Sequence, residues 1–190
     1  MKKPVFIYSQ EFEKYSYPPG SMFITQRAVK TRELLRSLNL LGGERGKESV
    51  PAPATKRQLQ KFHSARYLEA LQQAADGRLT PEGRRMGLGT PDCPVFKDMF
   101  DYASLACGAT LTGAELILSG ETDIAFNPSG GYHHAKAEKA SGFCYLNDLV
   151  LACIRFSNNG KRVLYLDLDA HHGDGVQEAF YSSNKVCLLY

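Results

Sequence analysis

The sequence has no long hydrophobic run. No segment approaches the roughly 20 apolar residues that a transmembrane helix requires. The apolar run Val5 to Tyr8, close behind Lys2 and Lys3, is shorter than the roughly 7–15 residues of a signal-peptide core. We therefore expect residues 5–8 to form a buried strand and the protein to be cytoplasmic.

Basic clusters are also missing. The 23 lysines and arginines nearly balance the 20 acidic residues, the net charge is only +3, and no five basic residues are consecutive. Nucleic-acid binding therefore has no electrostatic support in this sequence. With 190 residues, 43% of them apolar, the chain has the size and composition of one globular domain.

Paired cysteines are absent as well. The five cysteines form no CxxC motif and their number is odd, so a metal-binding cysteine pair or a disulfide framework is not indicated. We expect free thiols in a reducing compartment.

Strand-like and helix-like segments alternate along the chain. Apolar character predicts strands at residues 5–8, 123–126, 162–169 and 186–190. Periodicity and end signals predict helices at residues 24–41, 55–62, 64–75, 100–118, 146–156 and 175–180. Residues 76–94 are rich in Gly, Pro and Arg and are expected to be a long, functional loop. This alternation favours an α/β fold with a sheet covered on both faces, and residues 162–169 have the apolar character of a central parallel strand.

Four of the five histidines occur as two adjacent pairs. The second pair lies in residues 167–175 (DLDAHHGDG), a segment that begins in the last residues of the predicted strand 162–169. Because strand residues two apart share a face, Asp167, Asp169 and His171 project together if the strand continues to its end. Ligand sites of open α/β sheets lie at this end of the strands. Asp169 and His171 offer a carboxylate and an imidazole, a pair suited to zinc or iron, although a catalytic zinc takes three protein ligands.

The alternative interpretation of this segment is structural. Asp167 and Asp174 would cap the following helix, and the histidines would satisfy local hydrogen bonds. Such a dense cluster at a strand end favours a functional site.

The first pair, His133-His134, follows a Gly-Gly turn and is a weak signal by itself. The downstream aspartates strengthen it, because a histidine that accepts a proton works best when a carboxylate holds its other ring nitrogen. Asp167 and Asp174 are available for that role. Two His–Asp pairs beside one metal predict a hydrolytic site.

Residues 133–148 (HHAKAEKASGFCYLND) and 165–175 (YLDLDAHHGDG) closely resemble the histone deacetylase family. Residues 87–96 (GLGTPDCPVF) are similar to its bacterial branch, which includes acetoin-utilisation-type proteins, and residues 62–68 (FHSARYL) are also in the family's style. The resemblance covers nearly the whole chain.

The resemblance implies an arginase-like α/β fold with a mainly parallel sheet between helices. It implies metal-dependent hydrolysis of the amide of an N-acetylated lysine or amine, with release of acetate. Asp169 and His171 are then metal ligands, to Zn2+ or Fe2+. His134, paired with Asp174, is implied to be the general base and acid, and His133, paired with Asp167, its electrostatic partner.

The remaining implied site residues bind the substrate. Gly142 and Phe143 would line a narrow acyl-lysine channel, although core filling is an equally good interpretation of Phe143. Asp92 would grip the substrate backbone at the rim, against the alternative of a turn cap. Arg27 would lie near the inner end of the pocket, against the alternative of a solvated helix residue. The resemblance also implies a structural K+ near residues 167–171.

Family members are up to about twice as long and take a third metal ligand, an aspartate, and a substrate-binding tyrosine from downstream. Neither can be assigned here, and Tyr190 comes too early for the tyrosine. We therefore expect residues 1–190 to be one incomplete deacetylase-like domain, an N-terminal portion. Two alternatives stay open: a non-catalytic fragment that binds a metal or an acetylated ligand, and, with less support, an arginase-like enzyme acting on guanidino compounds.

Overall fold

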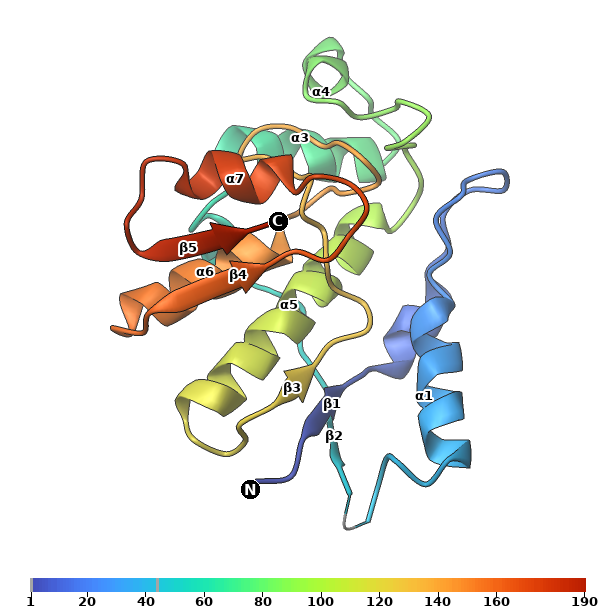
Figure 1. Cartoon of the computed structure of the whole chain (residues 1–190). Helices are drawn as coiled ribbons and strands as arrows, with labels where there is room; N and C mark the ends of the chain where they lie inside the picture. Colours follow the sequence, from blue (N-terminus) through green and yellow to red (C-terminus); the bar gives the residue numbers. More distant parts are fainter. Residues whose placement is uncertain (1, 44) are drawn as a thin grey trace.

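The computed structural model describes residues 2–43 and 45–190, and every pair of its named strands is parallel. Strands β1 (Val5–Ile7), β2 (Lys47–Ser49) and β3 (Ala125–Phe126) form one sheet in the order β2-β1-β3. Strands β4 (Val163–Leu166) and β5 (Val186–Leu189) form a second sheet. Figure 1 shows the two sheets on one side of helices α5 and α6. The expected α/β fold with parallel strands is confirmed.

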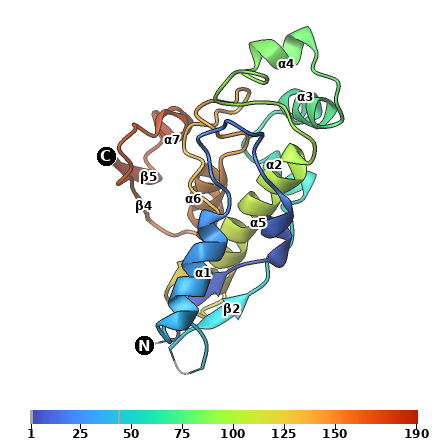
Figure 2. The same cartoon turned by 90° about the vertical axis from the view of Figure 1, so that its right-hand side faces the viewer.

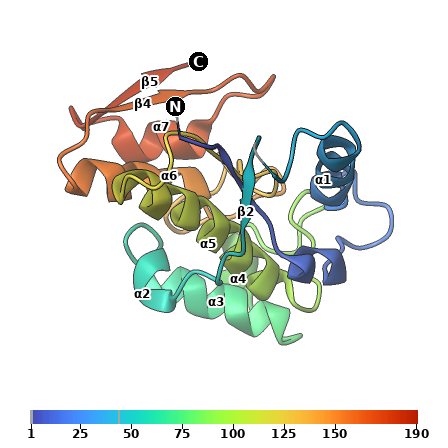
Figure 3. The same ribbon diagram turned by 90° about the horizontal axis from the view of Figure 1, so that it is seen from below.

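Seven α-helices and one 3-10 helix are described along with these strands. They are a 3-10 helix (Gln10–Lys14), α1 (Arg27–Ser37), α2 (Lys56–Leu59), α3 (Ala65–Ala75), α4 (Pro81–Arg85), α5 (Met99–Leu118), α6 (Asp148–Asn158) and α7 (Asp174–Phe180). Helices α1 and α5 lie on opposite sides of the first sheet (Figures 2 and 3). Helices α6 and α7 pack with β4 and β5 in a separate apolar cluster. None of the described helices is long and apolar enough to cross a membrane.

Small residues let α5 lie close to its neighbours. A Cβ on Gly108 would overlap the backbone of Ala52, and one on Gly113 would stand 3.1 Å from the Cβ of Ala125 in β3. Twelve residues of this 20-residue helix are buried. The helix predicted at residues 100–118 is confirmed, and its small side chains explain how it reaches the sheet.

The strand predicted at residues 162–169 is shorter and less buried than expected. It ends at Leu166, and Tyr165 points into the cluster with α6 and α7. The side chains of Leu164 and Leu166 are 61% and 52% exposed. The expectation of burial on both faces was wrong because no described element covers the second face of this sheet.

Two further predictions need correction. The helix expected at 24–41 spans only Arg27–Ser37, and Asn39, with φ 55°, turns the chain away after it. The loop expected at 76–94 contains α4, which begins where the Thr80 side chain accepts the Gly83 N–H. This start is a capping signal, which a search for periodicity overlooks. All five cysteines are free thiols, as expected.

Candidate functional site

The two histidine pairs come together where β4 ends. His133 Nδ1 lies 2.8 Å from Asp167 Oδ2, and His134 Nδ1 lies 2.8 Å from Asp174 Oδ1. The rings of His133 and His134 are 4.2 Å apart between centroids, and that of His171 is 6.1 Å from His134. Residues separated by 34 and 40 positions in sequence therefore form the two His–Asp pairs that the sequence predicts.

The His133–Asp167 pair is the more buried of the two. Side-chain exposure is 8% and 7% for this pair, against 20% and 39% for His134 and Asp174. The Tyr165 hydroxyl also donates to Asp167, at 2.5 Å. Burial raises the pKa of Asp167, but hydrogen bonds from Tyr165 and His133 outweigh it and lower the pKa below its ordinary value. Asp167 is therefore held as a carboxylate.

Asp174 is also stabilised as a carboxylate. Burial raises its pKa, and the hydrogen bond with His134 and the nearby Lys136 ammonium lower it by more. Lys136 Nζ lies 3.5 Å from Asp174 and 2.8 Å from Glu178. The sequence analysis assigned no role to Lys136 or Tyr165, although both lie within the two histidine motifs, because their contacts with Asp174 and Asp167 appear only in the folded chain.

Asp169 and His171 form a third, exposed pair. His171 Nδ1 lies 2.9 Å from Asp169 Oδ1, and the His171 backbone N–H donates to the same oxygen at 2.7 Å. These two hydrogen bonds lower the pKa of Asp169. The side chains are 53% and 78% exposed. Strand geometry ends before them, so a turn, and not strand alternation, brings the two groups together.

This donor pair fits part of a zinc site. Ligands about 2.0–2.1 Å from a tetrahedral ion stand roughly 3.3 Å apart, so Asp169 and His171 need only a small opening to bind one. Zinc also accepts this combination of carboxylate and imidazole. Among the described residues, however, no group of three or more His, Cys, Asp or Glu side chains could hold a metal ion. The described residues thus bring together two candidate donors, Asp169 and His171.

Three glycines allow the histidines, the aspartates and the neighbouring backbone to pack closely in the site. A Cβ on Gly142 would overlap the His134 ring, and one on Gly175 would overlap the Ala135 carbonyl. A Cβ on Gly173 would approach Asp167 Oδ2 to 2.5 Å. These three positions accept only glycine without displacing the His–Asp pairs or their backbone.

Gly142 and Phe143 form a tight turn beside His134. Ser141 and Cys144 exchange backbone hydrogen bonds of 3.1 and 2.8 Å, and the two residues between them have φ values of 51° and 66°. Positive φ at both central positions is typical of a type I′ hairpin turn. It is strained for Phe143, whose carbonyl accepts the Tyr17 hydroxyl at 2.6 Å. The Phe143 ring is half-buried and stacks on Phe23, 5.9 Å away.

Two buried polar residues at the start of α6 anchor the first histidine pair. Asn147 Nδ2 donates to the Ala135 carbonyl at 2.8 Å and to that of His133 at 3.4 Å. Asp148, fully buried, accepts the Tyr132 N–H at 2.9 Å. Sequence reasoning assigned neither residue a role. The helix-capping preference of asparagine was the available signal, since Asn147 is the N-cap of α6.

The outer predicted residues lie apart from this cluster. Asp92 is exposed in the loop before Cys93, and Arg27 is exposed at the start of α1 with its guanidinium 4.8 Å above the Phe23 ring. Because Phe23 also stacks on Phe143, Arg27 and the hairpin turn are connected through one ring. His172 contacts Gln177 and the Tyr190 ring.

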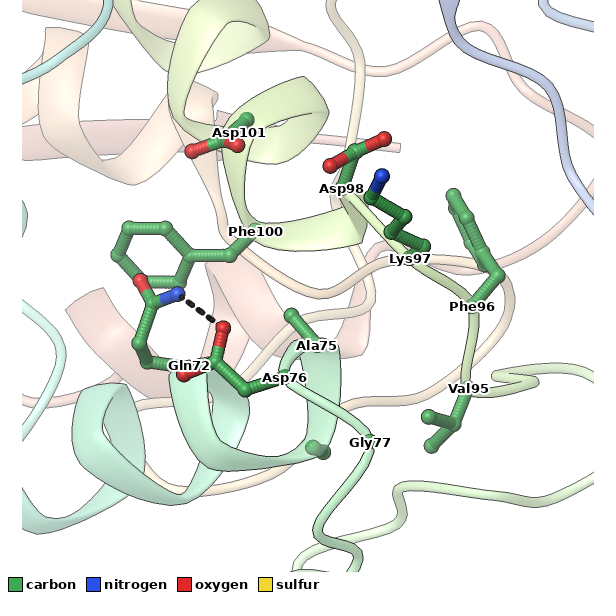
Figure 4. A pocket seen from close by; sticks show the side chains of 11 residues that line it. Gln72, Ala75, Asp76, Gly77, Val95, Phe96, Lys97, Asp98, Phe100 and Asp101 are labelled. Atoms are coloured by element: carbon green, nitrogen blue, oxygen red, sulfur yellow. Dashed lines mark hydrogen bonds between the residues drawn. The ribbon is translucent and has the colours of Figure 1, made fainter.

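A separate pocket of about 490 Å3 lies between the end of α3 and the start of α5. Figure 4 shows its walls, with Phe96 and Phe100 among carboxylates such as Asp98. None of the predicted site residues lines it. We therefore place the candidate site at the histidine cluster.

Residues 22–189 match the family model of the histone deacetylase domain. The chain belongs to the histone deacetylase family. It is 41% identical to the acetoin utilization protein AcuC of Bacillus subtilis, over all of this chain and 49% of that protein. It is 40% identical to histone deacetylase 8 of Xenopus tropicalis, over 96% of this chain and 49% of that protein.

Solved structures agree with this assignment. The crystal structure of a histone deacetylase homologue from Aquifex aeolicus is similar with a TM-score of 0.88 and 37% identity, over 98% of this chain and 50% of that one. A homologue complexed with SAHA is similar with a TM-score of 0.87 and 36% identity, over 99% and 50% of the two chains. The chain therefore has the arginase/deacetylase fold, and it spans about half the length of the relatives it matches.

Proposed function

We propose that this chain supplies the histidine–aspartate part of a metal-dependent active site that hydrolyses the amide of an N-acetylated lysine or amine and releases acetate. The observation that carries the proposal is the pair of 2.8 Å contacts, both through Nδ1, from His133 to Asp167 and from His134 to Asp174. Each contact leaves the Nε2 atom of its histidine available for a proton.

His134 is the general base and then the general acid in this proposal. Its Nδ1–H donates to Asp174, which fixes the tautomer and stabilises the imidazolium that forms when Nε2 takes a proton from water. The same proton is then available to the leaving amine. His133, with the more buried Asp167, tunes the electrostatic field beside it.

Asp169 and His171 would hold the metal, for which Zn2+ is preferred and Fe2+ fits the same donors. When bound, such an ion lowers the pKa of water to about 7 and polarises a carbonyl. The third ligand and the carbonyl-binding tyrosine would come from a part of the domain beyond these residues. A structural K+ near residues 167–171 remains a prediction from the family.

Four further residues would contact the substrate. Phe143 and Gly142 would line the acyl-lysine channel, and the left-handed backbone of Phe143 supports a functional role because it is a strained conformation. Asp92 would bind the substrate backbone at the exposed rim, and Arg27 would lie on the acetate path beside Phe23. A homologue binds SAHA, an acetyl-lysine mimic, which supports an acetylated substrate.

A second function is a metal- or acetyl-ligand-binding fragment without turnover. The pairing of only two candidate donors, Asp169 and His171, among the described residues favours it. The expectations that residues 1–190 are a single incomplete domain and that the protein is cytoplasmic remain predictions.

The experiment measures acetate release from an acetyl-lysine reporter by the 190-residue chain, with and without a chelator. Chelator-sensitive release that His134→Ala abolishes and His172→Ala preserves would support catalysis. Binding of zinc and SAHA without release would support the fragment. Release that is unaffected by His134→Ala, or no binding of either ligand, would contradict the proposal.

A further inference from the structure

A fifth histidine, His63, is buried outside the site. It lies between α2 and α3, is only 1% exposed, and packs between the rings of Phe62 and Tyr67 at centroid distances of 4.8 and 5.6 Å. It is 70 or more residues from the histidine pairs in sequence, and the proposed chemistry does not use it. A buried imidazole of this kind needs a reason for its polar atoms.

The environment of His63 selects one protonation state. Its Nε2 atom accepts the backbone N–H of Asn147 at 3.0 Å, so that atom carries no proton and the ring proton is on Nδ1. Burial lowers the pKa of His63 to about 4, and the carbonyls of Ala137 and Lys136 oppose this only in part. No described residue makes a hydrogen bond of ordinary geometry with Nδ1.

Asn147, the hydrogen-bond partner of His63, also contacts the backbone of the candidate site. Through its side chain, Asn147 donates to the carbonyls of Ala135 and His133, which flank His134. Its Oδ1 atom accepts the Val150 N–H at 3.0 Å and so ties the same side chain to α6. His63 therefore contacts the residue that fixes the backbone on both sides of the proposed general base.

Two residues close to His63, Ser64 and Tyr67, also bind the loop of residues 133–147. The Ser64 backbone N–H donates to the Ala137 carbonyl at 3.2 Å. Tyr67, one turn into α3, donates its hydroxyl to the Tyr145 carbonyl at 2.7 Å. Residues 63–67 thus bind the segment 133–147 through Ala137 in its first part and through Tyr145 and Asn147 at its end.

We infer that His63 is a positioning residue, which as its Nδ1–H tautomer holds Asn147 so that the asparagine amide fixes His133 and His134 against their aspartates. A phenylalanine at position 63 would fill the space but leave the Asn147 N–H without an acceptor. Glutamine extends an acceptor oxygen to about the distance of Nε2. The role in catalysis rests on the proposed function, whereas the positioning itself does not.

The test uses side-chain 15N NMR of the 190-residue chain at one pH near 7, without metal. In the unaltered chain we expect His63 to be the Nδ1–H tautomer. His63→Phe should shift or broaden the Nδ1–H signals of His133 and His134, and His63→Gln should restore them. Tyr67→Phe is the matched control, since it removes another buried hydrogen bond to the same loop. It should lower the melting temperature and leave both signals in place.

A protonated Nε2 on His63 in the unaltered chain would overturn the inference even if His63→Phe does not fold. So would unchanged His133 and His134 signals in a folded His63→Phe, or equal disturbance by Tyr67→Phe, which would indicate a merely structural role. Retained turnover in His134→Ala would defeat the proposed function but leave these NMR outcomes unaffected.

Discussion

The site has two parts that are built in opposite ways. The His133–His134 part is held by distant residues, because its ring nitrogens reach Asp167 and Asp174, and its backbone is fixed by Asn147. The Asp169–His171 part is local, since its contacts join residues two apart in an exposed turn.

In the proposed function, this difference separates rigid proton-transfer groups from adaptable metal ligands. Buried, multiply bonded groups are costly to disturb, while exposed pairs contribute little to stability. The proton-transfer part should therefore be formed before any metal binds, and the ligand pair should adjust when it does. The predictions below follow this contrast from the largest expected effect to the smallest.

The largest effect is expected from Asp148→Ala. The change leaves the Thr110 hydroxyl and the N–H groups of Gly131 and Tyr132 without their buried acceptor. We expect a loss of about 3–5 kcal/mol in the free energy of unfolding. Asp169→Ala in the exposed part should cost less than about 1 kcal/mol. Urea denaturation of both variants measures the contrast, and similar losses would contradict it.

The second effect is a pH dependence from His63. Its pKa is lowered from 6.5 to about 4 in the folded chain, so the unfolded chain binds the proton more readily. The contribution of His63 to stability is therefore full above pH 6.5 and falls toward pH 4, by about 3 kcal/mol at most, whereas the raised pKa of the buried Asp148 carboxyl acts in the opposite direction. The pKa values of Asp167, Asp169 and Asp174 lie below 3.8, so their contribution is lost only at lower pH.

Urea denaturation at pH 7 and pH 4.5 measures this dependence. His63→Gln should remove the loss in the free energy of unfolding that the unaltered chain shows between these two pH values. An equal loss in the free energy of unfolding between pH 7 and pH 4.5 in His63→Gln would show that another group is responsible.

The third effect tests the close approach of Gly142 to His134. Gly142→Ala places a methyl group onto the ring in addition to the strain of its φ of 51°. Gly160→Ala is the control, because its φ of 71° is strained too but nothing lies within 4 Å of the added carbon. We expect Gly142→Ala to cost about 1–3 kcal/mol more than the control. Equal melting temperatures would show that His134 moves freely.

The smallest effect is expected at Leu168. This side chain is 86% exposed between the two parts of the site. Leu168→Ser should change the free energy of unfolding by less than about 0.5 kcal/mol. A loss above 1 kcal/mol in thermal denaturation would mean that the described surface of this turn is covered in solution.

Much of this arrangement could be predicted from the sequence. The alternation of segments indicated the parallel α/β fold, and the two histidine motifs indicated two His–Asp pairs. The family resemblance assigned His134 to Asp174, and the structure places the two 2.8 Å apart. Local chemistry succeeded there because each motif carries its own functional groups. The family resemblance, confirmed over residues 22–189, supplied the reaction that we propose.

Other features depend on packing that no local pattern records. The exposure of Leu164 depends on what covers the second sheet, and the strand pattern predicted a cover that the described residues do not provide. The contact of His63 with Asn147 joins residues 84 positions apart. The α4 helix was missed for a different reason, because its signal is local but is the cap at Thr80 and not a periodic face.

The most direct test of the central contrast is a zinc titration of the 190-residue chain followed by side-chain 15N NMR. The account predicts that Nδ1 of His171 shifts on binding, while the Nδ1–H signals of His133 and His134 are already present without metal and stay in place. Shifts confined to His133 and His134, or the appearance of their Nδ1–H signals only after zinc is added, would contradict it.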